Sequence, residues 1–178
     1  MGPTGRPCRG ARVTPPARLV RLHRHNVTNV LVMGGSAEQR LQIAYAFHRE
    51  SLVRRGPFVC VDGERDELRL RMSIQSRVSS MCPDVPADPL RAAEHGTFFL
   101  DSVGSMSKDT QRMLLAFLLR CVNVSPADDE GAWVGRLVAG STEHLSIAVG
   151  NGCFSAALYD FLDKVRVELP VAFREHAA

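Results

Sequence analysis

The stretch Asn29-Val30-Leu31-Val32-Met33-Gly34-Gly35-Ser36-Ala37-Glu38-Gln39-Arg40 decides the fold class of this chain of 178 residues. An apolar run leads into two glycines, and a helix-like pattern follows. This strand–turn–helix order is where a nucleotide-binding protein places the phosphate loop G-x-x-x-x-G-K-[S/T]. Gly34 stands at the first glycine of that pattern, but Gln39 replaces the second glycine and Arg40 replaces the lysine. The stretch predicts the fold of a nucleotide-hydrolysing protein from which the hydrolysis has been lost.

Four more apolar runs follow this one, with amphipathic segments between them. We predict strands over 30–33, 58–62, 97–101, 136–141 and 165–169, and helices over 38–49, 67–78, 90–94 and 108–121. Nearly continuous apolar strands separated by helices are typical of a parallel sheet with helices on both faces. We therefore predict an α/β fold with a five-stranded parallel sheet.

Periodicity also predicts which side chains of the helices face the core. In the segment 38–49 these are Leu41, Ala44, Tyr45 and His48, and we interpret His48 as a packing residue rather than a catalytic one. The segment 67–78 offers only a thin apolar stripe. Its predicted members are Leu68, Met72 and Ile74.

Composition divides the chain into a single domain with short tails. Residues 1–16 are basic and rich in proline and glycine, so we expect a disordered tail there, followed by the domain over 17–172 and a short tail over 173–178. The first 24 residues hold six arginines and no acid, while the net charge of the whole chain is only +3. Such a stretch could contact nucleic acid or an acidic surface, although a solvated tail is the preferred interpretation.

Several classes of protein are disfavoured by the same composition. The five cysteines are odd in number and include no C-x-x-C pair, which favours reduced thiols over a disulfide framework or a zinc site. No apolar run approaches the roughly 18–20 residues that span a bilayer, and prolines and arginines interrupt the N-terminus where a signal peptide would need an apolar segment. We expect a cytoplasmic protein that does not insert into membranes.

With the elements placed, five blocks of residues resemble the central AAA+ domain of sigma-54-dependent transcriptional activators, the bacterial enhancer-binding proteins. The pattern G-P-F-V-x-V-N-C of that family is matched from Gly56 to Gly63, G-T-L-F-L-D-E from Gly96 to Ser102, and R-x-I-A-A-T-N from Arg136 to Thr142. The remaining blocks cover 30–51 and 152–164, and the second of the three quoted blocks continues through Leu118. The resemblance implies the α/β subdomain of a P-loop NTPase.

The positions that would hold nucleotide and metal in this family are only partly kept. The resemblance makes Gly34, Gly35, Ser36 and Arg40 a vestigial phosphate loop, and Asp101 a vestigial magnesium ligand. Glu38 would bring negative charge next to a phosphate, and the wide, planar guanidinium of Arg40 is a poor substitute for a compact ammonium.

The positions that act on hydrolysis have changed. Ser102 stands where the family has the glutamate that polarises the attacking water, and a serine supplies no carboxylate base. The two candidate arginine fingers map to Ser155 and Phe161, and the sensor asparagine maps to Thr142. Loss of several independent roles predicts that the chain does not hydrolyse ATP.

Two further features of the family are not found in this sequence. The G-A-F-T-G-A loop that contacts sigma factor should lie between Asp62 and Gly96, where no such motif occurs, so direct contact with sigma factor is doubtful. We also expect neither the helical lid nor a helix-turn-helix, and therefore no sequence-specific DNA binding.

Our first hypothesis is a catalytically inactive AAA+-like module that acts by protein–protein association, with itself or within a partner's assembly, in bacterial transcription regulation or signalling. It needs no cofactor. The alternative is a switch that binds ATP or ADP with magnesium weakly and does not hydrolyse it. Residual ATPase activity with an unconventional base is the least favoured of the three.

Overall fold

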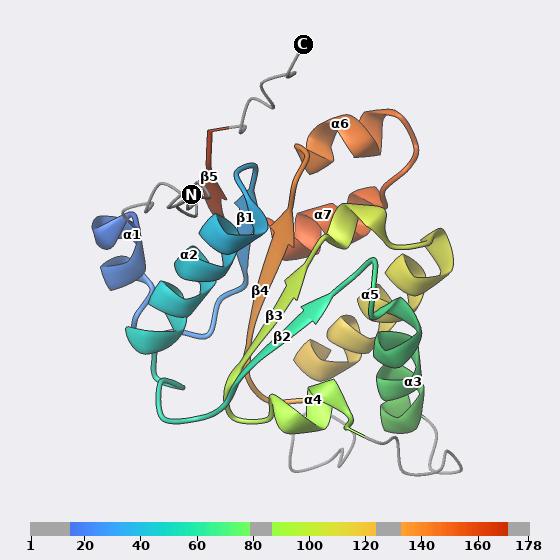
Figure 1. The fold of residues 1–178 in the computed structure, drawn as a ribbon. Coiled ribbons are helices and arrows are strands. Elements are labelled where there is room, and N and C mark those ends of the chain that lie inside the picture. The colour runs from blue at the N-terminus through green and yellow to red at the C-terminus, as the bar shows by residue number, and fades with distance from the viewer. Residues whose placement is uncertain (1–14, 79–86, 124–132, 171–178) are drawn as a thin grey trace, which may run out of the picture.

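A computed structural model of the chain describes residues 15–78, 87–123 and 133–170. Five parallel strands form one sheet in the order β2-β3-β4-β1-β5 (Figure 1). The predicted five-stranded parallel sheet is confirmed, and each strand lies where the sequence predicts it. The strands are β1 (Val30–Met33), β2 (Phe58–Asp62), β3 (Thr97–Asp101), β4 (Arg136–Ser141) and β5 (Val165–Glu168).

Helices cover both faces of the sheet, as predicted (Figure 1). On one face lie α1 (Ala17–Leu22) and α2 (Ala37–Arg49), and the other face carries α3 (Glu67–Val78), α5 (Lys108–Asn123) and α7 (Ala156–Leu162). Three short helices connect these elements near the ends of the strands. They are α4 (Pro89–Ala92), the 3-10 turn η1 (Val103–Ser105) and α6 (Leu145–Gly150).

Strand β1 shows how the sheet divides the core in two. All four of its side chains are buried; Val30 and Val32 join the core beneath α1 and α2, whereas Leu31 and Met33 join the core beneath α3, α5 and α7. A strand buried on both faces has no polar side to present, which explains the continuous apolar run in its sequence.

The outward faces of two helices differ from the prediction. In α2, Ala44 and His48 are buried as predicted, but Leu41 and Tyr45 are exposed, because Ile43 and Phe47 take the inward positions. In α3, Ile74 is buried but Leu68 and Met72 are exposed. The exposed members of both stripes lie one helical turn apart, so each helix presents an apolar strip to solvent.

The helices α1, α6 and α7 were not predicted, since each has only six or seven residues and the apolar period has no length in which to repeat. The predicted tail over 1–16 lies almost wholly outside the described residues, as do residues 173–178. Among the described helices none is long and apolar enough to cross a membrane.

Arg136 is the largest fully buried side chain among the described residues, and it joins three segments at the amino end of the sheet. Its Nη1 donates to the carbonyl of Phe47 at 3.0 Å, and its Nη2 donates to the carbonyls of His23 and Asn26 at 2.6 and 2.5 Å. Burial lowers the pKa of Arg136 to about 10, so the group stays charged at neutral pH. This arginine therefore fixes the chain after α1 against the end of α2.

Glu67 ties the start of α3 to the start of α5, and this contact predicts a pH dependence. Its carboxylate accepts hydrogen bonds from the hydroxyls of Ser107 and Thr110 and from the backbone N–H of Ser107 at 3.1 Å. These bonds, that of the Ser107 hydroxyl foremost, lower the pKa of Glu67 from its ordinary value. The stabilisation is complete above the pKa of the unfolded chain and is lost as the pH falls through the lower pKa of the folded state.

Replacement of Glu67 by glutamine should therefore lower the free energy of unfolding at neutral pH by about 1 kcal/mol, as for loss of a helix cap. The gap to the unmodified chain should narrow in acid, where the wild-type carboxylate is also protonated. Urea unfolding of both proteins at about pH 7, 5 and 3.5 measures this difference in the free energy of unfolding. These pH values lie above and below the usual pKa of a glutamate. The exposed Glu64→Gln variant is the control, and a gap independent of pH would contradict this role of Glu67.

Candidate functional site

The predicted phosphate loop is a tight turn between β1 and α2, packed beneath the end of β5. Gly34 and Gly35 both have positive φ, at 79° and 61°, a region that favours glycine. A Cβ on Gly34 would lie 2.3 Å from the carbonyl oxygen of Leu169, so only glycine fits there. The N–H of Gly34 donates to the carbonyl of Ser141 at 2.9 Å, which fastens the turn to the end of β4.

Ser36 and Gln39 close the amino end of α2 on itself. The N–H of Gln39 donates to Ser36 Oγ at 3.2 Å, and the N–H of Ser36 donates to Gln39 Oε1 at 2.8 Å, which together make a capping box. In a phosphate loop the backbone N–H groups at this helix start point at the bound anion. Here two of them are already taken, one by the side chain of Ser36 and one by that of Gln39, which replaces the second glycine.

Arg40 and Asp101 form a buried, two-pronged ion pair at the centre of the site. Arg40 Nε lies 2.6 Å from Asp101 Oδ1, and Arg40 Nη2 lies 2.9 Å from Asp101 Oδ2. Only 3% of Arg40 and 7% of Asp101 is exposed. The residue at the lysine position of the phosphate loop thus binds the residue at the metal-ligand position, and the two charges cancel.

The rest of the Arg40 guanidinium is bound by its own loop. Nη1 donates to the carbonyl oxygens of Gly34 at 3.2 Å and of Gly35 at 3.0 Å. A phosphate group needs hydrogen-bond donors and a free positive charge, and a magnesium ion needs a carboxylate oxygen that is open to it. The loop instead turns carbonyl oxygens inward, and both oxygens of Asp101 are engaged. In this arrangement the residues do not fit a nucleotide phosphate with magnesium.

Gly140 is the part of the site that sequence reasoning missed. A Cβ at this position would lie 2.2 Å from Asp101 Oδ1, so the missing side chain is what leaves room for the carboxylate beside β4. The signal was present in two forms. A glycine inside an apolar strand marks a close approach, and the matching pattern R-x-I-A-A-T-N has alanine at this position.

Ser102 follows Asp101 and faces a small hollow at the carboxyl edge of the sheet. It has a positive φ of 54°, an uncommon conformation for a residue other than glycine. The hollow has a volume of about 130 Å³, and its polar lining residues are Ser102, Ser105, Ser141, Thr142 and Glu143. Glu143 is thus the carboxylate that borders this hollow.

Ser155 and Phe161, which replace the candidate arginine fingers, both hold the fold together. The N–H of Ser155 donates to Gln111 Oε1 at 2.8 Å, and its hydroxyl accepts from the N–H of Leu158 at 3.3 Å, which caps α7. The carbonyl of Phe161 accepts from Asn29 Nδ2 at 3.1 Å. Neither position offers a positive charge to a neighbouring subunit.

His48 has the packing role predicted for it. It is buried, and its Nδ1 lies 3.0 Å from Thr97 Oγ1. Burial and the nearby charge of Arg136 lower its pKa, so the ring is neutral at neutral pH. Within the described parts of the chain, no three histidine, cysteine, aspartate or glutamate side chains gather as a metal site.

Comparison with known proteins gives the same picture as the motifs. Residues 87–168 match the family model of the Sigma-54 interaction domain. The DNA-binding transcriptional regulator NtrC of Klebsiella pneumoniae is 28% identical over 163 residues, which is 84% of this chain and 33% of that protein. The nitrogen assimilation regulatory protein NtrX of Azorhizobium caulinodans is 25% identical over 145 residues, covering 80% of this chain and 32% of that one. The chain thus spans about a third of the length of these relatives.

Solved structures share the fold. NtrX from Brucella abortus in complex with ATP superimposes with a TM-score of 0.67 at 20% identity, over 86% of this chain and 34% of that one. The P-loop NTPase domain of a sigma-54 activator from E. coli gives a TM-score of 0.59 at 16% identity, over 86% of this chain and 98% of that domain. In sequence the chain is similar to the AAA+ domain of sigma-54-dependent activators, and in fold it shares the P-loop NTPase α/β core.

Proposed function

We propose that the chain is a non-hydrolysing AAA+-type module that acts by association with other protein subunits in bacterial transcription regulation. The observation that carries this proposal is the buried pair of Arg40 and Asp101, which joins the two groups that would otherwise bind phosphate and magnesium. Because these two charges pair with each other, Arg40 offers no free positive charge to a phosphate and Asp101 offers no free carboxylate to magnesium.

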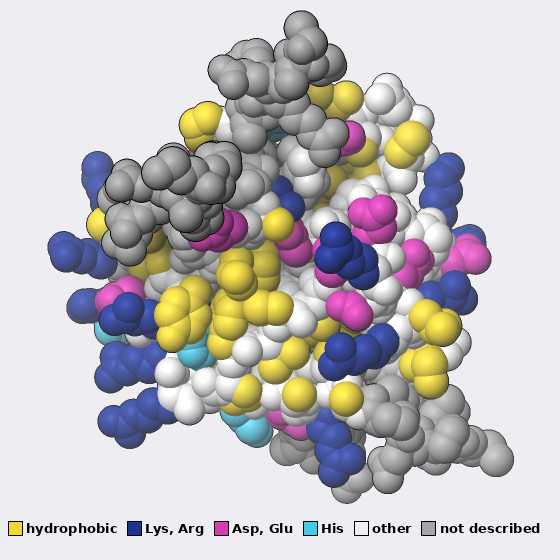
Figure 2. All heavy atoms as spheres, in the orientation of Figure 1, with side chains coloured by type: hydrophobic (Ala, Val, Ile, Leu, Met, Phe, Trp, Pro, Cys, Tyr) yellow, Lys and Arg dark blue, Asp and Glu magenta, His cyan; other side chains and the backbone are white. Residues whose placement is uncertain are grey.

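The surface supports association. Leu41 and Tyr45 on α2 and Leu68 and Met72 on α3 are apolar side chains that the sequence predicts to be inward and that are exposed (39–72%) in the isolated chain. Figure 2 shows hydrophobic side chains gathered in the region of α2. Phe58 of the edge strand β2 continues this surface, since its ring centroid lies 5.3 Å from that of Tyr45. Apolar strips of this kind are typical of surfaces that pack against another subunit.

The alternative, a weak ATP or ADP switch, requires the same pair to open. Gly34 and Gly35 keep the backbone turn of a phosphate loop, and Arg40 keeps a positive charge at the lysine position. A nucleotide would have to displace Asp101 and the two carbonyl oxygens from the guanidinium. Breaking a buried ion pair is costly, so the closed form is favoured over this switch.

The first prediction from this proposal concerns the stability of the pair. Either single variant, Arg40→Met or Asp101→Asn, should lower the free energy of unfolding by roughly 3–5 kcal/mol, because each leaves a buried charge unpaired. The double variant Arg40→Met/Asp101→Asn should recover much of that loss, since it removes both charges. Denaturant unfolding of the three variants measures the coupling.

Arg112 and Asp109 provide the control, since they form an exposed ion pair on α5. Arg112→Met should change the free energy of unfolding by about 0–1 kcal/mol. Losses as small as this in both Arg40→Met and Asp101→Asn would contradict the closed site.

A mixing experiment tests the function itself. The chain is added to an ATP-hydrolysing AAA+ domain of the NtrC type, and the rate of hydrolysis and the mass by light scattering are measured. We expect the rate to fall and mixed assemblies to form, because Ser155 and Phe161 bring no arginine to a shared interface. An inert protein of similar mass is the control. An unchanged rate, together with a chain that stays monomeric alone and in the mixture, would overturn the proposal.

A further inference from the structure

Six arginines gather on one edge of the molecule without acidic partners. They come from α1, from the turn after it, from the last residue of α2 and from the loop toward β2. Each is exposed, and in the described parts of the chain none of them makes an ion pair; Arg24 Nε donates a hydrogen bond to His25 Nε2 at 2.7 Å. The six are Arg18, Arg21, Arg24, Arg49, Arg54 and Arg55. We call this set the arginine edge.

Four arginines outside the arginine edge pair with acids. Arg40, Arg77, Arg112 and Arg166 each pair with a carboxylate. The chain has a net charge of only +3, yet the arginine edge alone carries six positive charges. Figure 2 shows Lys and Arg side chains along the edge where α1 and the carboxyl end of α2 lie in Figure 1. The positive charge of the protein is therefore concentrated on this side.

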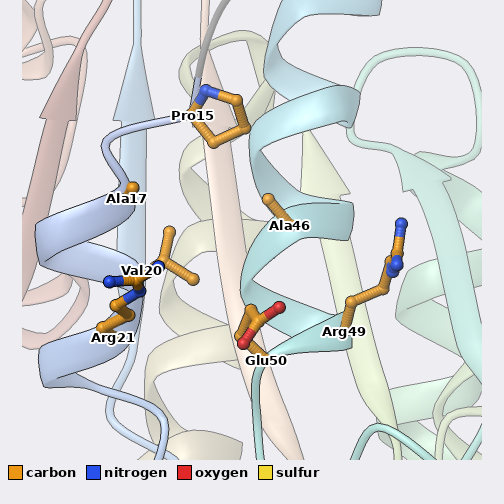
Figure 3. A pocket seen from close by; sticks show the side chains of 7 residues that line it. All are labelled: Pro15, Ala17, Val20, Arg21, Ala46, Arg49 and Glu50. Atoms are coloured by element: carbon orange, nitrogen blue, oxygen red, sulfur yellow. The ribbon is translucent and has the colours of Figure 1, made fainter.

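Two adjoining hollows run along the arginine edge. The first, of about 350 Å³, lies between α1 and α2; Figure 3 shows Val20 and Ala46 on its two sides, with Glu50 between the helices. The second, of about 380 Å³, is lined by Arg24, His25, Arg54 and Arg55 among others. Glu50 borders both hollows, and we call the two together the groove; five of the six arginines line it, and Glu50 is the carboxylate among its lining residues.

The walls of this groove are held in place by Arg136. This buried residue binds the carbonyls of His23 and Asn26 on the α1 side and of Phe47 in α2. Val20 of α1 is also buried in the core beneath α2. The backbone that forms the walls of the groove is thus fixed by the packing of the fold.

We propose that the arginine edge binds the phosphodiester backbone of nucleic acid, without regard to base sequence. Each guanidinium of the edge is a planar fork that matches two phosphate oxygens. A row of unpaired cations along a groove suits a linear polyanion, whereas a flat anionic membrane would not enter it. In the sequence the same charge continues through Arg6, Arg9 and Arg12. This inference is independent of the phosphate loop and goes beyond the proposed association with protein.

Fluorescence anisotropy of the full chain with a labelled duplex of about 20 base pairs and arbitrary sequence tests the inference. We expect Kd in the range of about 1–100 μM near physiological salt, and a steep loss of affinity as salt rises. The variant Arg24→Gln/Arg54→Gln/Arg55→Gln should weaken binding by more than about tenfold and reduce the slope of log K against log salt by about three units. Glu50→Gln should strengthen binding, because it removes the one carboxylate in the groove.

Matched controls separate the groove from overall charge. Arg65→Gln/Lys108→Gln/Arg112→Gln removes three exposed cations near the starts of α3 and α5, and Glu64→Gln removes an exposed acid there. Both should leave duplex binding nearly unchanged. No binding even at about 50 mM salt would overturn the proposal. So would equal losses in the two triple variants, or tighter binding to vesicles of anionic phospholipid than to the duplex.

Discussion

The ion pair between Arg40 and Asp101 is the interaction on which the rest of the candidate site depends. It joins the start of α2 to the end of β3, and the free nitrogen of Arg40 gathers the carbonyls of Gly34 and Gly35 around it. An arginine is suited to this work, because its planar fork binds a carboxylate through two hydrogen bonds and still has donors left. A lysine, with one compact ammonium, could not hold the turn and the carboxylate in the same way. Arginine in place of lysine thus does more than weaken the binding of a phosphate by the loop. It gives the loop a different role, which is to bind Asp101.

Two buried arginines lie at opposite ends of the strands of the parallel sheet. Arg40 lies at the carboxyl edge, where parallel α/β sheets carry their ligand sites, and Gly140 leaves the room that Asp101 needs there. Arg136 lies at the amino edge and fixes α1 beside α2. The first arginine closes a site, whereas the second supports the groove of the arginine edge. A domain in which Arg40 and Asp101 pair with each other still has its outer surfaces free to bind other molecules.

Much of this architecture could be predicted from sequence, because the evidence is local. Most of the strands are nearly continuous apolar runs, β5 alternates apolar and charged residues, and the glycine turn before α2 has a recognisable motif. The prediction of the inward faces of α2 and α3 was partly wrong. Four apolar side chains fit the helical period but face solvent: Leu41, Tyr45, Leu68 and Met72. The closed site could not be predicted, because Arg40 and Asp101 are 61 residues apart and only the packed sheet brings them together. The sequence of the loop alone does not distinguish a loop that still faces a phosphate from one whose arginine binds a carboxylate of the same chain.

The central claim is that the ion pair closes the phosphate site, and calorimetric titration of the full chain with ATP and magnesium tests it most directly. ADP and inorganic triphosphate serve as comparisons, and Arg40→Met is titrated beside the unmodified chain. The account predicts no saturable heat with any of these ligands. Saturable binding of ATP by the unmodified chain that is lost in Arg40→Met would contradict it, since it would mean that the guanidinium leaves Asp101 to take a phosphate.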